Sequence, residues 1–453
     1  MAVLEFILSV FRTPALILSL VALIGLIVQR KTGTQIFSGT VKTALGLLIL
    51  SGGVGVLITA ILPFVVLFEQ VTGLEGFATG SEMISAAMQN IAVIGSTFAI
   101  IMAGGFLVNV LLARLTPLKY IFLTGHMMWI GSVLVSYCLY AAGLSPIAIM
   151  ILGSIIQGAL LTLLPAISQP LVRKVIGNND FAIAHLTTLG TVPAAYIGKL
   201  LGNPANSTED MKLPKGLAFF KDTAVAISVV MLVFYMVLIL IAGPARVATV
   251  QEILGNSVGT NFVVFGLLQA LGFAAGILIM LQGVRMLLGE IVPAFKGISE
   301  KVVPNAIPAL DVPAIFPYAP NALMIGFIFA TLGMLVAMAA SGAAFGVVPL
   351  VSIIGAFFTG GVAGIFGNAV GGRRGAIIAG FMYGFILIFL SGFTFWVFGG
   401  FADVGITGVG HDCVDAMVTM LVFRNPVVGI IVLAAAFVGL SILERRYQKR
   451  NQG

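Results

Sequence analysis

The sequence predicts an all-α, polytopic membrane protein with about eleven transmembrane helices, re-entrant hairpins and two halves of inverted topology. Of its 453 residues, 60% are hydrophobic and only 9% are charged, whereas soluble domains carry about 25% charged residues. Glycine is abundant, with 55 residues, and small residues let membrane helices pack closely. Eleven apolar runs are each long enough to cross a bilayer, which takes ~20 residues. These features exclude a water-soluble globular protein.

The predicted spans follow one another along the chain. They cover residues 13–29, 43–68, 91–113, 120–142, 145–170, 223–243, 262–288, 322–341, 345–370, 375–398 and 425–443. Three further stretches, 73–90, 178–203 and 303–320, are semi-polar and rich in Gly, Pro and Asn, and 401–420 is similar. Such segments are tolerated at membrane depth only where they are buried in protein or line a watery cavity. We therefore expect the first three to be re-entrant or broken helices.

The basic residues predict the orientation, because cytoplasmic loops carry an excess of Lys and Arg. The basic tail at 444–450 places the C-terminus in the cytoplasm, and eleven spans then place the N-terminus outside. With this topology 20 of the 23 basic residues fall inside, and only Arg12, Arg246 and Arg424 fall outside. The N-terminal run lacks a basic flank and a cleavage site, so we expect it to stay in the membrane.

The longest polar stretch, residues 203–222, divides the first ten spans into two groups of five. We expect one integral membrane domain over 1–453, with halves at 1–202 and 223–424, a cytoplasmic linker at 203–222, and a last helix and tail at 425–453. The halves are weakly self-similar at a shift of about 230 residues. Since five is odd, the halves must be inverted, and inverted repeats with broken segments are typical of transporters.

A few ionisable residues have apolar surroundings, which is costly and marks them as candidates for function. They are Glu69, Glu75, Glu82, His126, His185, Glu290 and Asp311. Glu69 and Glu290 lie near span ends and Glu75 lies in a loop-like stretch, so solvation or ion pairing explains these three.

The remaining residues indicate where a ligand binds. Asp311 lies among prolines in the broken segment of the second half, and Ser81 and Glu82 occupy the corresponding place in the first half. His126 lies inside a hydrophobic span, and His185 lies in another broken segment. Broken segments at corresponding positions of two halves point to the substrate site of a transporter.

Enzymatic motifs are absent from the sequence, which contains no phosphate-binding loop, no HExxH and no GxSxG. We therefore expect no catalytic residue, no metal and no cofactor. His411, Asp412 and Asp415 are interpreted as a solvated external loop rather than a metal site. The glycines and arginines at 371–374 are interpreted as a turn on the inner face.

Seven short runs carry a family resemblance and lie in order over nearly the whole chain. They are residues 39–43, 123–126, 211–214, 281–286, 294–299, 309–311 and 319–322. Together they resemble the ascorbate-type enzyme IIC permease of the phosphoenolpyruvate-dependent phosphotransferase system. The resemblance implies an eleven-span homodimer in the bacterial cytoplasmic (inner) membrane that moves its substrate by an elevator-type mechanism. It also implies separate IIA and IIB proteins that supply the phosphate, and no phosphoryl-carrying residue in this chain.

The resemblance also implies site residues. The family's substrate histidines fall on His126 and His185, and its aspartate falls on Asp311. Two glutamines beside those histidines fall on Ile130 and Leu186, and a Thr-Tyr pair falls on Ser81 and Glu82. Replacing such polar groups changes selectivity, so the expected substrate is L-ascorbate or a related sugar acid or polyol. The expected substrate-binding set is Ser81, Glu82, His126, Ile130, His185, Leu186 and Asp311.

Two functions remain open at this point. The leading hypothesis is a group-translocating permease, and the alternative is an ion-coupled secondary transporter of a small polar solute with Glu82 or Asp311 as the coupling site. For the first, the IIB protein must approach from the cytoplasm, so the linker at 203–222 and the pair Arg373-Arg374 form a candidate docking face. Simple retention of positive charge on the inner side explains the same residues. No nucleic-acid partner is expected, since the bases do not cluster on a polar domain.

Overall fold

The structure is a computed structural model that describes residues 14–72, 77–88, 91–211, 223–255, 257–301, 303–404 and 408–452. Within it, helices occupy every predicted span. They are α2 (Pro14–Val28), α3 (Gly33–Thr72), α5 (Ala92–Leu115), α6 (Gly125–Ala141), α7 (Pro146–Ile176), α9 (Thr223–Leu254), α10 (Phe262–Lys301), α11 (Pro320–Phe345), α12 (Ile353–Gly355) with the π-helical turn η3 (Ala356–Gly360), α13 (Gly361–Val397) and α15 (Pro426–Gln452). The prediction of a largely α-helical membrane protein is confirmed.

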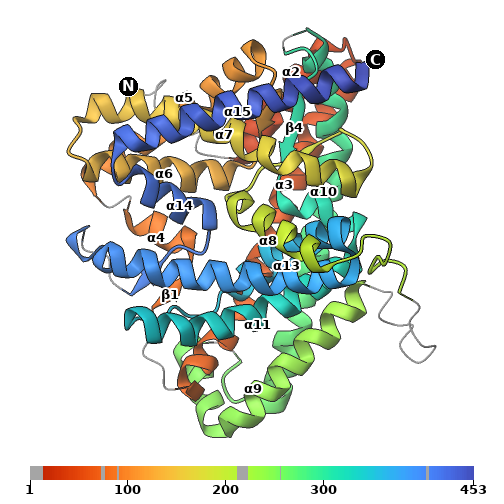
Figure 1. Ribbon diagram of the computed structural model, residues 1–453. Coiled ribbons are helices and arrows are strands. Elements are labelled where there is room, and N and C mark those ends of the chain that lie inside the picture. Colours follow the sequence, from red (N-terminus) through yellow and green to blue (C-terminus); the bar gives the residue numbers. More distant parts are fainter. Residues whose placement is uncertain are drawn as a thin grey trace.

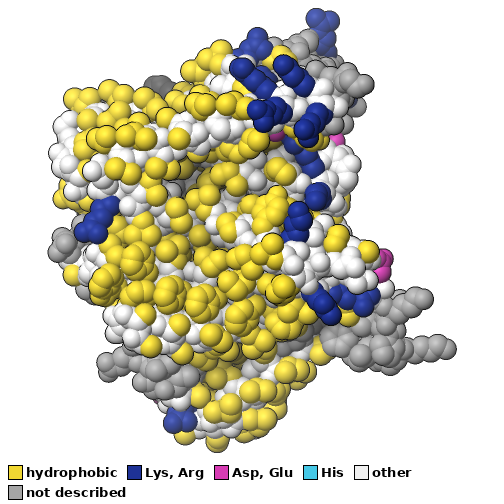
Figure 2. All heavy atoms as spheres, viewed as in Figure 1, with side chains coloured by type: hydrophobic (Ala, Val, Ile, Leu, Met, Phe, Trp, Pro, Cys, Tyr) yellow, Lys and Arg dark blue, Asp and Glu magenta, His cyan; other side chains and the backbone are white. Residues whose placement is uncertain are grey.

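By length and apolar composition, six helices of the described chain are able to cross a membrane. They span 92–115, 146–176, 231–254, 320–345, 356–397 and 426–450. The count of eleven spans remains a prediction. In Figure 1 the ribbons of α11, α13 and α15 run in nearly the same direction across the view. Figure 2 shows that Lys and Arg gather mainly on the side where α15 ends, while apolar side chains cover much of the rest of this face.

The predicted turn at 371–374 lies inside α13. Gly372 has φ 60° and ψ −151°, a backbone conformation that is open essentially to glycine alone. Gly367 and Gly375, on either side of it, lie so close together that a Cβ on Gly367 would collide with the Gly375 carbonyl oxygen. This contact shows that the chain reverses direction at Gly372. The candidate span at 356–397 is therefore two helices packed side by side, which agrees with the two separate spans predicted at 345–370 and 375–398.

Each predicted broken segment contains a short strand followed by a short helix. The pairs are β1 (Ala78–Thr79) with α4 (Ser81–Met88), β3 (Ala182–Ile183) with α8 (Thr188–Leu201), and β4 (Ile307–Leu310) with the 3-10 helix η2 (Val312–Tyr318). The 401–420 stretch holds β5 (Val409–Gly410) and α14 (Val414–Phe423), after η4 (Gly399–Val404). None of these helices reaches the ~20 residues that a span requires.

The strands form two small parallel sheets that the all-α prediction did not include. One has the order β2-β4-β3, where β2 is Tyr120–Phe122, and the other pairs β1 with β5. Ala309 of β4 is opposite Ala182 of β3, and Ala78 of β1 is opposite Val409 of β5. Segments far apart in the sequence thus satisfy each other's backbone groups, which is essential away from water.

The two sheets correspond to one another under exchange of the halves. A shift of about 230 residues relates β1 to β4 and β3 to β5, so the pairs β1-β5 and β4-β3 are equivalent. The same shift relates the pairing of Tyr120 with Ile307 to the isolated bridge between Pro349 and Phe77. In a parallel sheet the carboxyl ends of all strands meet at one edge, so side chains that follow these strands are brought together.

Candidate functional site

Three predicted site residues lie at the carboxyl edge of the β2-β4-β3 sheet. His126 is the second residue of α6, which begins shortly after β2, and His185 follows β3 by two residues. Asp311 comes directly after β4 and caps η2. His126 Nε2 lies 3.8 Å from Asp311 Oδ2, and the two imidazole rings have centroids 6.4 Å apart. One ligand atom from each residue lies within 4.8 Å of the others. The structure therefore brings together His126, His185 and Asp311.

The polar atoms of this cluster are incompletely paired by the protein. Asp311 Oδ1 accepts a hydrogen bond from the Val312 N–H at 2.8 Å, while Oδ2 faces His126. His185 is only 5% exposed, and its Nδ1 has no hydrogen-bond partner among the described residues. Buried polar atoms in native proteins nearly always have a partner. The cluster is thus suited to a ligand that donates and accepts hydrogen bonds.

Side chains of these types also bind metal ions. The same convergence, with its three ligand atoms within 4.8 Å of one another, is compatible with a cation as well as with hydroxyl groups. The sequence predicted a substrate site without metal.

Ile130 and Leu186 lie beside the histidines and are buried. Ile130 is one turn beyond His126 on α6 and is fully buried, while Leu186 follows His185 and is 5% exposed. Both belong to the hydrophobic cluster that includes Met127 of α6. Residues four apart on a helix share one face, so Ile130 adds an apolar neighbour to the side of α6 that carries His126.

Ser81 is hydrogen-bonded to residues 411–412, a segment that contacts none of the other candidate residues through a described hydrogen bond. It begins α4 and is buried; its N–H donates to Asp412 Oδ1 at 2.9 Å, and its Oγ accepts from the Asp412 N–H at 3.1 Å. Ser81 Oγ also lies 3.3 Å from His411 Nδ1. Glu82 belongs to α4, which packs against α6. Its side chain lies outside the described part of the structure, as do the side chain of Glu69 and the whole of Glu75.

The interpretation of residues 411–415 as a solvated loop is wrong. His411 is 2% exposed and Asp415 is 1% exposed. Asp412 holds the start of α4 and also accepts from Ser352 Oγ at 2.8 Å. Asp415 accepts from two backbone N–H groups in the first turn of α8, those of Thr188 at 2.9 Å and Leu189 at 2.7 Å. Helix N-termini leave such groups unpaired, so these acids position both broken segments.

The sequence analysis missed these roles because each acid serves a helix more than 200 residues away. A third acid acts in the same way. Glu209, in the described part of the linker, accepts from the N–H groups of Asn321 at 3.3 Å and Ala322 at 2.9 Å, so it caps the start of α11. The prediction for Glu290 holds, since it is paired with Lys42 at 3.2 Å.

The described part of the linker, 203–211, lies on the turn between the two helices of α13. The Arg373 N–H donates to the Asn206 carbonyl at 2.8 Å, and Arg373 Nε donates to the Ser207 carbonyl at 3.1 Å. Arg373 and Arg374 are both exposed. The two features proposed as a docking face therefore form one surface, while residues 212–222 lie outside the description.

The chain matches a family model and is similar to a known protein. The family model described as "PTS system sugar-specific permease component", where PTS is the phosphotransferase system, matches residues 9–412. An "Ascorbate-specific PTS system EIIC component" from Mycoplasma pneumoniae is 29% identical over 423 residues. This alignment covers 83% of the present chain and 64% of that protein, so the chain spans less than two thirds of this relative's length.

Proposed function

The chain belongs to the family of sugar-specific permease components of the phosphotransferase system, and we propose that it is a membrane permease for L-ascorbate or a related sugar acid or polyol. Uptake is coupled to phosphorylation of the substrate by separate IIA and IIB proteins. The observation that supports this function most directly is the convergence of His126, His185 and Asp311 at one sheet edge. It joins segments from both halves of the chain, as expected for a transporter with repeats.

The chemistry of the cluster suits a polyhydroxylated ligand. A carboxylate accepts hydrogen bonds from hydroxyl groups, and an imidazole both donates and accepts. The unpaired His185 Nδ1 and the Asp311 oxygen facing His126 offer such contacts without rearrangement. Ser81 and Glu82, at the equivalent position of the first half, complete the proposed site from the opposite side.

Selectivity among sugar acids and polyols would depend on the two aliphatic neighbours. Ile130 and Leu186 are buried where the resembling family places glutamines, so the pocket offers fewer hydrogen bonds to a substrate hydroxyl. A missing polar partner changes preference more strongly than a change in apolar volume does. The double substitution Ile130→Gln with Leu186→Gln should therefore shift preference toward ascorbate in a panel of sugar acids and polyols.

The helices divide into two packing groups, which supports an elevator-type movement. Helices α2, α3, α9 and α10 pack mainly against one another, whereas α5 packs with α7, and α13 packs with α8 and α11. Packed with the second group are α6, which carries His126, and β3, which precedes His185. We propose that the second group moves as the carrier while the first group remains as the scaffold in a homodimer. The equivalent strand pairs support inverted halves with re-entrant tips. The one-sided gathering of bases supports a cytoplasmic C-terminus (Figure 2), and eleven spans then place the N-terminus outside.

The proposed IIB surface comprises 203–211 with Arg373 and Arg374. Hydrogen bonds join these parts, and both guanidinium groups are exposed. Charge reversal of both arginines to Glu should reduce phosphotransfer from IIB, with Arg445→Glu on the basic tail as the matched control. Unchanged phosphotransfer with normal membrane insertion would reject docking on this surface.

The proposed function is tested by binding and by uptake. Asp311→Asn and His185→Ala should each weaken ascorbate binding by roughly 5- to 150-fold, because losing a buried partner costs about 1–3 kcal/mol. Asp210→Asn is the control, since Asp210 is exposed in the linker. Accumulation in vesicles should require phosphoenolpyruvate and the soluble phosphotransfer proteins. Wild-type affinity in both site variants would place the site elsewhere, and accumulation driven by an ion gradient alone would favour a secondary transporter coupled through Glu82 or Asp311.

A further inference from the structure

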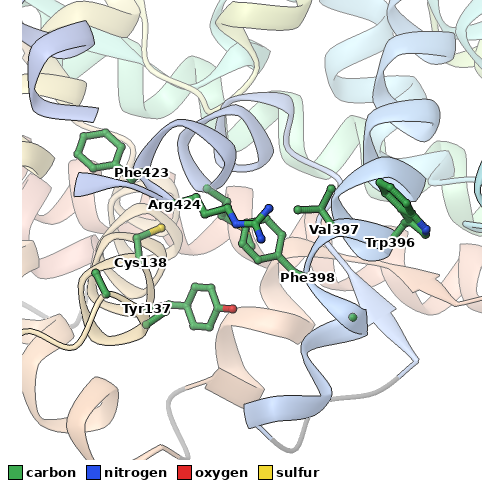
Figure 3. A pocket seen from close by; sticks show the side chains of 11 residues that line it. Tyr137, Cys138, Trp396, Val397, Phe398, Phe423 and Arg424 are labelled. Atoms are coloured by element: carbon green, nitrogen blue, oxygen red, sulfur yellow. The ribbon is translucent and has the colours of Figure 1, made fainter. Parts of the chain in front are cut away.

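A cavity of about 590 Å³ lies at the end of α6 that is remote from His126. It lies between the last turn of α6, the end of α13 and the end of α14 (Figure 3). Binding sites for small molecules typically measure about 300–1,000 Å³. The lining includes Tyr137, Trp396, Phe398 and Arg424.

The cavity is distinct from the site at the sheet edge. Along α6, Tyr137 lies 11 residues after His126, which corresponds to about 16 Å at 1.5 Å per residue. Arg424 ends α14, and it is one of the few bases predicted for the outer side. The 27-residue helix α15 begins two residues after Arg424 and ends in the basic tail, so Arg424 and the tail lie at opposite ends of that helix. With the proposed orientation, the cavity faces the outside of the cell.

The lining combines one cation with aromatic rings. Arg424 is exposed, and no carboxylate in the described part of the chain pairs with its guanidinium. Figure 3 shows the Arg424 guanidinium and the Tyr137 hydroxyl directed toward the same space beside Phe398, with Trp396 on the far side. Arginine is suited to planar oxyanions such as carboxylates, and aromatic faces contact the apolar side of a small ring. The site therefore fits a small organic anion.

A chain of aromatic contacts leads from the cavity to the α4 tip. The ring of Tyr137 contacts Phe401 edge-on with centroids 5.8 Å apart, and Phe401 contacts His411 at 6.4 Å. His411 Nδ1 in turn lies 3.3 Å from Ser81 Oγ. Phe401 has φ +60°, which is rare for a bulky residue.

We propose that this cavity is an outer recognition site, in which Arg424 binds the anionic group of the substrate before the substrate reaches His126, His185 and Asp311. The inference rests on the proposed function and adds to it an earlier binding step and a negative charge on the substrate. A cation that lines an open cavity raises the local concentration of anions and their rate of entry. An anionic lipid headgroup offers the same chemistry, so the experiment separates the two sources.

The test measures initial uptake of ascorbate, which is an anion at neutral pH, by proteoliposomes of zwitterionic lipid supplied with the phosphotransfer proteins. Arg424→Gln should raise KM roughly tenfold with kcat unchanged, as for loss of a contact made before the rate-limiting step. Arg424→Lys should retain part of the effect because it keeps the charge. Arg246→Gln is the matched control: Arg246 is predicted on the same side but does not line the cavity.

Three results would overturn the inference. An unchanged KM in Arg424→Gln, with normal loss of binding in Asp311→Asn, would reject the outer site and leave the proposed function intact. An effect of Arg424→Gln that requires phosphatidylglycerol in the vesicles would assign the cavity to a lipid headgroup. A wild-type protein that neither binds nor takes up ascorbate or any other sugar acid or polyol of the panel would reject the proposed function, and this inference with it.

Discussion

Replacing Asp415 by alanine tests whether a single buried acid positions the segment that carries His185. The Asp415 side chain accepts hydrogen bonds from the N–H groups of Thr188 and Leu189 at 2.9 and 2.7 Å. These groups belong to the first turn of α8, and Thr188 follows His185 by only three residues. Alanine removes both acceptors and leaves two backbone donors unpaired, that of Thr188 buried and that of Leu189 partly buried.

The size of the effect follows from those two donors. Each unpaired buried donor costs about 1–3 kcal/mol, so the pair costs roughly 2–6 kcal/mol if no water replaces the carboxyl group. Since 1.4 kcal/mol corresponds to a factor of ten, even the lower bound predicts exchange of the Thr188 and Leu189 amides roughly 30-fold faster. A less ordered α8 start should also weaken ligand binding at His185.

Hydrogen exchange followed by mass spectrometry measures this effect in a peptide that covers residues 186–192. Asp415→Asn should have an intermediate effect, since one carbonyl oxygen still accepts. Asp210→Ala is the control, because Asp210 is exposed. If the peptide exchanges at the wild-type rate in Asp415→Ala, the carboxyl group does not hold the start of α8, and the reasoning is refuted.

Other predictions concern the packing and topology of the bundle. Glu444→Gln should lower the free energy of unfolding in detergent by about 1–3 kcal/mol, because Arg173 Nη2 donates to Glu444 at 2.9 Å with both side chains nearly buried. If the double variant with Arg173→Gln loses the sum of the two single effects, the two side chains are not coupled. Gly384→Leu should separate α11 from α13 and lower the melting temperature, since a Cβ at this position meets the Ala330 carbonyl and overpacking is destabilising. Gly52→Ala should leave the melting temperature unchanged, because Gly52 faces open space. A membrane-impermeant maleimide should label Asp210→Cys only from the cytoplasmic side, as both native cysteines are buried; labelling only from outside would reverse the topology.

The sequence by itself determined the membrane class, the positions of the long helices and the broken segments. Transfer of apolar runs into lipid depends on local composition, so it can be predicted without knowing any contact. The turn at Gly372 was predictable for the same reason, because its backbone conformation needs only a glycine. The candidate residues His126, His185 and Asp311 were found from their cost in apolar surroundings and from the family resemblance.

Only the tertiary structure decided which segments satisfy one another. The sheet edge that joins His126, His185 and Asp311 exists because β4 pairs with strands about 125 and 190 residues earlier in the chain. The prediction of a solvated Asp415 was wrong for the same reason. The polar stretch around Asp415 indicates solvent exposure, but in the folded chain the start of the distant helix α8 packs against its side chain. In a low-dielectric interior, unpaired backbone groups are too costly to leave, but the choice of partner depends on packing of the whole chain.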